Sequence, residues 1–368
     1  MCALSLSAIL LSCGRNDQEP AAQPIRVGVV MPLTGASSVH GQDALAAIRM
    51  AQERVNAAGG VNGRRIELVV EDNASLPAKV VEAMQKMIDV DKVCVIIGPI
   101  SSSETLAGAE VATRAKVVLF SPTAASPKIH GASPYCFSIG LMTSPQGERL
   151  ADYCFRELGI REMGILAMND ETGISYADSF HDAYVKRGGR ITTYMKYSKT
   201  DTEFRTALTS LREKGVRHLY VSAVPQTMGF IVRQATEIDY RPGFFANAGI
   251  EGEDFITIGK NAAEGVIFTG LAPGEDFVRA FMERTKRQPS ICAPQSYDAF
   301  NIIVNALRAG GGDRESIRRY LANMPPVTGV GGDIRFDSTG EVVRQAHLKT
   351  VLKGRFVKLG RGDDADGN

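Results

Sequence analysis

The chain contains 368 residues, 44% of them hydrophobic, and its 42 Lys and Arg side chains nearly cancel its 41 Asp and Glu side chains. This length exceeds what one hydrophobic core usually fills, so it predicts two globular domains. A net charge of +1 argues against the basic face that neutralises nucleic-acid phosphates, and no apolar run approaches the ~20 residues that span a bilayer. We therefore expect neither a nucleic-acid partner nor a membrane-spanning helix.

The first 24 residues differ in composition from the rest of the chain. A short apolar run ends in LLSC (Leu10 to Cys13) and gives way to a polar stretch with two prolines. This arrangement is typical of an export signal, and LLSC resembles the lipobox of bacterial lipoproteins, whose cysteine is acylated. We expect a lipid anchor at Cys13, a tether over 14–24, and a location in the periplasm or on the outer face of the cell membrane. The alternative is a stray cysteine in an export signal.

From Ile25 onward, strand and helix patterns alternate. Apolar runs without polar alternation predict strands covered on both faces, and amphipathic segments that end near glycine predict helices. The predicted strands are 25–33, 65–72, 93–99 and 116–122, and the predicted helices are 43–60, 77–89 and 103–115. This alternation predicts an α/β lobe with a parallel sheet.

The same alternation begins again after residue 147. Five further strands and four helices are followed by three helices between 275 and 323, and the chain ends in an antiparallel region with a hairpin at DSTGE. Because helices need a sheet to cover, we expect 275–323 to return to the first lobe and the tail to join the second. The predicted organisation is lobe one at 25–141 plus 272–325, lobe two at 142–271 plus 326–358, and a polar tail at 359–368.

The spacing of the cysteines and the lack of known catalytic motifs argue against a metal site and against catalysis. Cys94, Cys136, Cys154 and Cys292 are widely spaced, without a CxxC pair or a nearby His at metal-ligand spacing, so no metal site is expected. Buried thiols are favoured over disulfides, because Cys94 lies in an apolar strand and Cys154 in a helix pattern. No nucleophile elbow, phosphate-binding loop or zinc-protease motif occurs. We expect a protein that is not an enzyme and uses no cofactor.

The loop after the third predicted strand, GPISSSE, is rich in hydroxyl groups. Ser101 and Glu104 have the spacing of a capping box, in which Glu104 reaches back to the helix N-terminus. This leaves Ser102 and Ser103, whose hydroxyl and N–H groups at a helix N-terminus favour an anion such as a carboxylate. Ligands bind beyond the carboxyl ends of the strands in open parallel sheets, so the hypothesis is a carboxylate site. The alternative is that the serines only cap the helix.

Several segments, in order along the chain, resemble one known family. IRVGVVMPLTGASSVHGQDALAAIRMAQERVNAAGG, GPISSSE, SPTAASPKI, SPQGERLADY and SYDAFNIIVNAL are similar to the leucine/isoleucine/valine-binding family, over about 25–358. The resemblance implies the type I periplasmic binding protein fold, in which two doubly wound parallel-sheet lobes joined by three crossovers close on a ligand. It also implies an extracytoplasmic component of an ABC transporter that delivers a small amino acid or carboxylate-like solute to a permease. The alternative is a ligand-sensing receptor domain for amides or organic acids that acts through a partner protein.

The resemblance assigns the half of the site that binds the ligand carboxylate. The family's serine that holds this carboxylate through its hydroxyl and N–H corresponds to Ser102, and the next loop supplies backbone groups at Thr123 and Ala125. The family's amino-acid binders have Thr at the position of Ala125, so one hydroxyl is missing here. The carboxylate anchor is therefore expected to persist with one donor fewer.

The rest of the implied site departs further from the family. The aromatic residue that covers the ligand falls on His40, and the tyrosines of the second lobe fall near Thr172 and Val224. The acidic residue that pairs with the ligand ammonium falls on Ala248, and Glu251 stands three residues on as a candidate substitute. A buried ammonium without a carboxylate partner is costly. A carboxylate without an amine, or an amide-like solute, is therefore as compatible with these residues as a branched-chain amino acid.

Two further acidic residues are expected to support the structure. Asp72 ends a predicted strand, and Asp298 opens an apolar helix. Acidic side chains at such positions commonly accept hydrogen bonds from the backbone N–H groups of turns and helix ends. We therefore expect capping and packing at both positions in preference to ligand binding.

Overall fold

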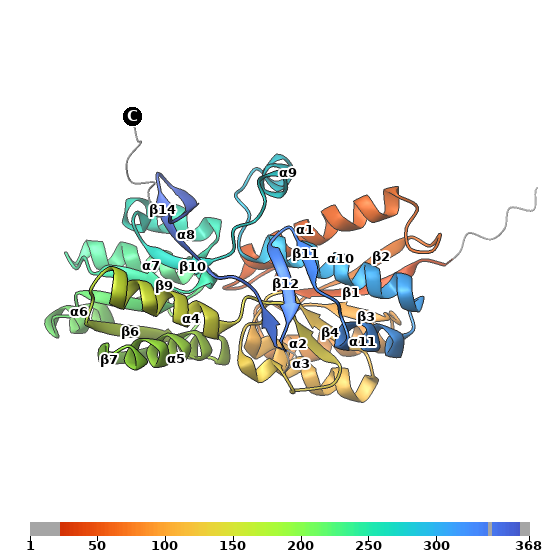
Figure 1. The fold of residues 1–368 in the computed structure, drawn as a ribbon, viewed down its shortest axis with the longest axis horizontal. Helices are drawn as coiled ribbons and strands as arrows, with labels where there is room; N and C mark the ends of the chain where they lie inside the picture. The colour runs from red at the N-terminus through yellow and green to blue at the C-terminus, as the bar shows by residue number, and fades with distance from the viewer. Residues whose placement is uncertain (1–22, 338–340, 361–368) are drawn as a thin grey trace, which may run out of the picture.

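The computed structural model describes residues 23–337 and 341–360, which form two α/β lobes lying side by side (Figure 1). Each lobe is built on its own sheet, and most strand pairs of the two sheets are parallel. The predicted fold class, with two parallel-sheet α/β lobes, is confirmed. The leader with Cys13 and the last eight residues lie outside the described residues.

The first lobe is built on a five-stranded parallel sheet with the order β2-β1-β3-β4-β5. Its strands are β1 (Ile25–Met31), β2 (Ile66–Asp72), β3 (Val95–Ile97), β4 (Val118–Ser121) and β5 (Cys136–Ser138). Its helices are α1 (Ser38–Ala57), α2 (Pro77–Asp89) and α3 (Ser102–Ala115). All of these elements except β5 match predicted segments. The sequence does not reveal β5 because its three residues, Cys-Phe-Ser, form no continuous apolar run, unlike the equally short β3.

The second lobe is built on a seven-stranded sheet with the order β15-β14-β10-β9-β8-β6-β7, in which β14 and β15 are antiparallel to their neighbours. Its strands are β6 (Glu162–Met168), β7 (Arg190–Tyr197), β8 (His218–Ser222), β9 (Gly243–Ala246), β10 (Ile267–Gly270), β14 (His347–Leu352) and β15 (Arg355–Lys358). Its helices are α4 (Thr143–Asp152), α5 (Glu171–Lys186), α6 (Arg205–Glu213), α7 (Pro225–Glu237) and α8 (Glu253–Gly259).

Three later helices pack on the first lobe, although they follow the second in sequence (Figure 1). They are α9 (Glu275–Thr285), α10 (Cys292–Gly310) and α11 (Arg314–Ala322). α10 lies along α1, and Phe277 and Phe281 of α9 pack against Ala47 of α1. The chain passes between the two sheets at 139–142, 271–274 and 344–346, so three connections form the hinge between the lobes.

The segment after α11 differs from the prediction that assigned all of 326–358 to the second lobe. β11 (Val327–Gly329), β12 (Gly332–Phe336) and β13 (Val342–Val343) form a separate three-stranded antiparallel sheet. Ile334 and Val342 pack into the hydrophobic core of the first lobe. Only β14 and β15 join the second sheet, because burial of these two side chains holds the preceding strands on the first lobe.

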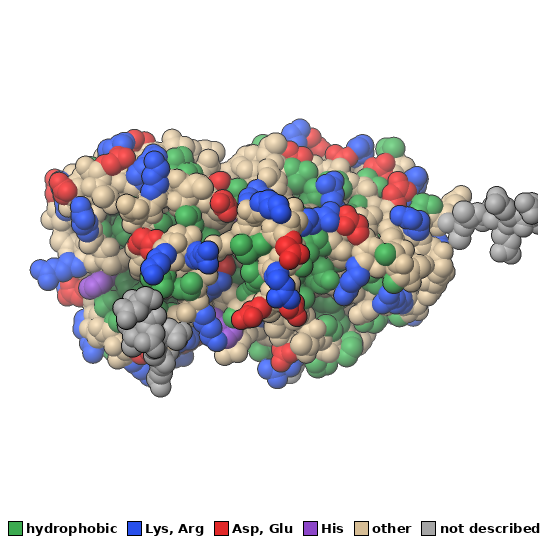
Figure 2. All heavy atoms as spheres, turned by 90° about the horizontal axis from the view of Figure 1, so that it is seen from above, with side chains coloured by type: hydrophobic (Ala, Val, Ile, Leu, Met, Phe, Trp, Pro, Cys, Tyr) green, Lys and Arg blue, Asp and Glu red, His purple; other side chains and the backbone are tan. Residues whose placement is uncertain are grey.

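The distribution of charge on the surface and the state of the cysteines both agree with the sequence. On the face seen in Figure 2, Lys and Arg side chains are interspersed with Asp and Glu over both lobes. No helix within 23–337 or 341–360 is long and apolar enough to cross a membrane. The four cysteines of this part of the chain are free thiols, three of them buried, which agrees with the preference for thiols over disulfides.

Candidate ligand-binding site

A cavity lies between the two lobes, at the carboxyl ends of their parallel strands. Its walls include residues from the loops that follow β3, β4, β8 and β9. In this closed arrangement the cavity is small, with about 60 Å³ open to the centres of water-sized molecules. The predicted ligand positions that line it are His40, Ser102, Thr123, Ala125, Thr172, Val224 and Ala248. Ser103 does not belong to the lining.

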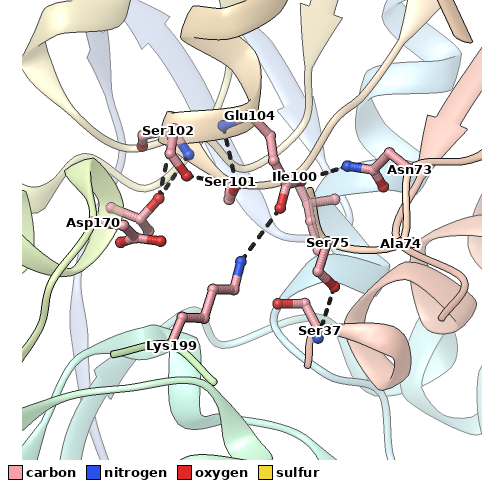
Figure 3. A network of polar contacts seen from close by, with 12 residues as sticks. Ser37, Asn73, Ala74, Ser75, Ile100, Ser101, Ser102, Glu104, Asp170 and Lys199 are labelled. Atoms are coloured by element: carbon pink, nitrogen blue, oxygen red, sulfur yellow. Dashed lines mark hydrogen bonds and ion pairs between the residues drawn. The ribbon is translucent and has the colours of Figure 1, made fainter. Parts of the chain in front are cut away.

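The β3–α3 loop carries the serines to the cavity. It turns at Gly98, whose φ is +103° and whose added Cβ would lie 2.0 Å from the carbonyl oxygen of Val30, so only glycine fits. Ser101 caps α3 as predicted, because its Oγ accepts a hydrogen bond from the Glu104 N–H at 3.4 Å. The other half of the capping-box prediction is wrong, since the Glu104 carboxylate is buried and bonds elsewhere (Figure 3).

Ser102 holds the loop after β4 and keeps a proton that it can donate. Its Oγ accepts hydrogen bonds from the N–H groups of Ala125 at 3.2 Å and Ser126 at 3.1 Å. A hydroxyl has one donor and two acceptor positions, so the Ser102 O–H remains able to donate. The Thr123 hydroxyl donates to the Ile100 carbonyl at 2.6 Å. The Ala125 N–H that the family resemblance assigned to the ligand is therefore used within the first lobe.

Thr172 brings the second lobe to the N-terminus of α3. Its Oγ1 accepts hydrogen bonds from the N–H groups of Ser102 at 3.0 Å and Ser103 at 3.3 Å. Thr172 stands in the first turn of α5, which Asp170 caps by accepting from the Gly173 N–H at 2.8 Å. A carboxylate bound directly by the two serine N–H groups would displace the Thr172 hydroxyl, whereas a carboxylate beside it would accept the hydroxyl proton.

Sequence reasoning missed an ion pair that joins the lobes beside these serines (Figure 3). Lys199 follows β7 and lines the cavity, and its ammonium lies 3.4 Å from Oε1 of Glu104. Oε2 of Glu104 accepts a hydrogen bond from Nδ2 of Asn73 at 2.9 Å. The Glu104 side chain has no exposed surface, and that of Lys199 is 16% exposed. Only the closed arrangement of the lobes brings these residues together, so no local pattern reveals the pair.

A second set of polar contacts also joins the lobes. The Ser126 Oγ donates to Oε1 of Glu171 at 2.8 Å, and the Ser175 Oγ donates to the Ser126 Oγ at 2.9 Å. The Lys128 ammonium pairs with Oε2 of Glu171 at 2.8 Å. Because Ser126 and Lys128 belong to the first lobe and Glu171 and Ser175 to α5, these bonds hold the lobes in a closed arrangement.

No acidic side chain lines the cavity within the described residues. Ala248 stands at the position of the family's acidic residue, and its N–H donates to Oε1 of Gln146 at 3.2 Å. Glu251 does not take that place, because its buried carboxylate forms an ion pair with Lys349 of β14 and does not belong to the lining. The cavity thus offers no carboxylate to a ligand ammonium.

His40 is a neutral hydrogen-bonding group that also bridges the lobes. Burial lowers the pKa of its imidazole to about 4, so the ring carries no charge at neutral pH. Its Nε2 lies 3.2 Å from the carbonyl oxygen of Glu251. Because a carbonyl oxygen only accepts hydrogen bonds, Nε2 carries the ring proton.

Much of the remaining wall of the cavity is apolar. Leu141, Met168, Val224 and Ile291 line it, and each is at most 8% exposed. Of these four, sequence reasoning identified only Val224, because a single apolar residue in a loop or at the end of a strand gives no sign that it faces a ligand. Such a wall suits the hydrocarbon part of a small solute.

Asp72 does not belong to the lining of the cavity. Asp72 braces the loop after β1, since its carboxylate accepts hydrogen bonds from the Leu33 N–H at 2.8 Å and the Thr34 hydroxyl at 2.6 Å. The described residues contain no group of three or more His, Cys, Asp or Glu side chains that could hold a metal ion. The polar groups of the site are therefore hydroxyl, amide, imidazole and ammonium groups.

Comparison with known proteins places the chain among binding proteins. An "Amino acid binding protein" of Pseudomonas aeruginosa is 26% identical over 333 residues, which cover 88% of each chain. The solved structure of a leucine-binding protein from Thermotoga maritima has a TM-score of 0.85 at 24% identity and covers 92% of this chain and 99% of its own. An ABC-transporter solute-binding protein of Rhodopseudomonas palustris in complex with 3,4-dihydroxybenzoic acid has a TM-score of 0.83 at 22% identity, covering 91% and 96%.

These two structures share the fold described above, and their identities of 24% and 22% support no statement beyond it. The sequence model of a family described as periplasmic binding protein matches residues 24–355. The match spans both lobes, all three hinge connections and every loop that lines the cavity. The chain is therefore a member of the periplasmic binding protein family.

Proposed function

We propose that this protein captures a small carboxylate-bearing solute between its lobes, outside the cytoplasm, and delivers it to an ABC permease. The observation that carries the proposal is Ser102, which stands at the N-terminus of α3 inside the cavity between the lobes. The positive end of a helix and an available hydroxyl proton favour an anionic acceptor there. The apolar walls then accommodate the rest of the solute.

The proposed carboxylate accepts hydrogen bonds from hydroxyl groups of both lobes. Ser102 supplies an O–H from the first lobe, and Thr172 supplies one from the second. Since the Thr172 oxygen accepts two N–H bonds from the start of α3, its O–H is polarised toward donation. A ligand bound by both hydroxyls contacts both lobes at once and thereby favours the closed arrangement.

Ser102→Ala is expected to weaken binding of such a carboxylate about ten- to hundredfold, the value of a charge-assisted hydrogen bond of about 1.5–3 kcal/mol. Isothermal titration of ligand-stripped protein with 3-phenylpropanoate and 4-methylpentanoate measures the effect. Ser103→Ala is the matched control, because the Ser103 side chain does not belong to the lining of the cavity, and it should leave affinity nearly intact. Equal affinities of wild type and Ser102→Ala would show that Ser102 does not bind the carboxylate and that the serines only cap the helix.

Attachment to a membrane through Cys13 is part of the proposal. LLSC follows an apolar run and precedes a polar tether, and two or three acyl chains give stable attachment where one gives only marginal binding. Cys13→Ser is expected to move the protein from the membrane fraction to the soluble extracytoplasmic fraction of an expressing bacterium. Cys2→Ser is the control, and an unchanged membrane fraction of Cys13→Ser would contradict the anchor.

A further inference from the structure

We infer that Lys199 is the cationic partner of the ligand carboxylate, and that it makes the site select carboxylates that lack an α-ammonium group. This inference rests on the proposed capture of a carboxylate and specifies its chemical class. Lys199 lies outside the set of residues that the family resemblance assigned to the ligand. Its place in the cavity follows from the structure alone.

The charges that face the cavity have one sign. Of the ionisable side chains in the lining, only Lys199 carries a charge at neutral pH, because His40 is neutral and no Asp or Glu belongs to the described lining. The N-terminus of α3 adds partial positive charge beside Ser102. A carboxylate gains from both, whereas an ammonium in the same cavity meets a like charge and no counter-ion.

The contact between Lys199 and Glu104 leaves capacity for a second anion. At 3.4 Å the ammonium-to-carboxylate distance exceeds that of an ordinary charge-assisted hydrogen bond, which is about 2.7–2.9 Å. Glu104 is meanwhile fixed from behind by Asn73. An ammonium has three donors, so Lys199 can keep its contact with Glu104 and still donate to a ligand in the cavity that it lines.

The acidic groups near the cavity are not placed to compensate a ligand ammonium. Glu104 is buried behind Lys199, and Glu251 is paired with Lys349. Asp170 accepts the Gly173 N–H and caps α5. An α-amino acid would therefore bury its ammonium without a partner, which costs far more than the neutral dipoles of Asn247 and His40 return.

Matched pairs of probes test whether the site prefers carboxylates that lack an α-ammonium group. Each pair shares one carbon skeleton and differs only in the α-ammonium: 3-phenylpropanoate with phenylalanine, 4-methylpentanoate with leucine, and propanoate with alanine. Isothermal titration of ligand-stripped wild-type protein is expected to show the carboxylate of the best-fitting pair binding at least about tenfold more tightly than its amino acid. An amino acid that binds as tightly as its carboxylate would overturn the inference and leave the proposed carboxylate capture standing.

A substitution tests the role of Lys199 itself. Lys199→Met is expected to weaken binding of the preferred carboxylate about ten- to hundredfold, while binding of the corresponding uncharged amide changes by no more than about threefold. Lys196→Met is the matched control, because Lys196 is an exposed residue of β7, and it should alter neither affinity. Thermal unfolding of both variants verifies that they are folded.

The outcomes separate the two proposals. If Lys199→Met binds the carboxylate as wild type does, Lys199 is not its partner and the inference fails while carboxylate capture stands. If Lys199→Met weakens the carboxylate and the amide equally, its role is structural and the inference also fails. If neither the carboxylates nor the amino acids bind wild-type protein, the proposed function fails, and the inference fails with it.

Discussion

Lys349→Met is expected to lower the free energy of unfolding by about 3–5 kcal/mol, because it leaves the Glu251 carboxylate buried without a charge partner. The side chains of the pair are 7% and 5% exposed, and they join β14 to the segment after β9. Lys349 pairs with Oε1 of Glu251, and Oε2 has no hydrogen-bond partner, so nothing else compensates the charge. Urea unfolding of wild type and variant measures the loss.

The decrease in the free energy of unfolding caused by Lys349→Met should depend on pH. Burial raises the pKa of Glu251 above its unfolded value, while Lys349 works in the opposite direction. Below the unfolded pKa the carboxyl is protonated in both states and no charge is buried. As pH rises through the folded pKa, the variant must bury an uncompensated carboxylate and loses stability, so the deficit is larger at pH 8 than at pH 5.

The double variant Glu251→Gln/Lys349→Met provides the control for this pair. It removes both charges together, and replacing a buried ion pair by neutral groups is often nearly neutral for stability. Most of the deficit of Lys349→Met should therefore be recovered. A double variant as unstable as the single one, or a single variant whose deficit does not change with pH, would show that lost packing of the lysine stem is the cause.

Asp298→Ala is expected to cost about 3–5 kcal/mol of stability, because one carboxylate holds three donors at the hinge. It accepts hydrogen bonds from the N–H groups of Val330 at 2.7 Å and Gly331 at 3.1 Å, and from Nη2 of Arg344 at 3.4 Å. Arg344 is buried and also donates to the Ile139 carbonyl at 3.1 Å. Without Asp298 its guanidinium charge is left buried and unpaired.

The neighbouring substitution Tyr297→Phe is the matched control for Asp298→Ala. It keeps the ring that packs against Phe277 and lies under the Arg54 guanidinium, so it should change stability by less than about 0.5 kcal/mol. Urea unfolding compares the two variants. A cost below about 1 kcal/mol for Asp298→Ala would mean that water reaches Arg344 at the hinge and replaces the carboxylate.

The strands and helices of this fold are predictable from the sequence where they are long and apolar. β1 and β6 are strands of seven residues, six of them buried in each, and α2 begins at a proline and ends where its apolar periodicity ends. β5 is as short as β3, but it has one buried residue where β3 has three, so it forms no apolar run. The prediction assigns β12 and β13 to the second lobe because Ile334 and Val342, the buried residues that hold them on the first lobe, stand apart in the sequence and show no periodicity.

The binding site likewise contains residues that the sequence predicts and residues that it does not. Ser102 and Thr123 follow strands in one lobe, so loop position and the family resemblance together lead to the cavity that they line. Lys199 contacts Glu104 across 95 positions of sequence, and the contact exists only because the lobes close. A lysine after an exposed strand resembles a solvated side chain, so its burial against the cavity cannot be predicted without the arrangement of the lobes.

The thiol of Cys292 gives this protein an internal reporter of its own opening. It begins α10 and lines the cavity, and burial raises its pKa far above the ordinary value of a cysteine. An exposed thiolate attacks alkylating reagents, so the rate of alkylation at Cys292 should follow how often the lobes part. Cys136 and Cys154 are also buried, each within the core of one lobe, and should react only when that lobe unfolds. A bound solute that slows modification of Cys292 alone would reveal occupancy without any introduced label.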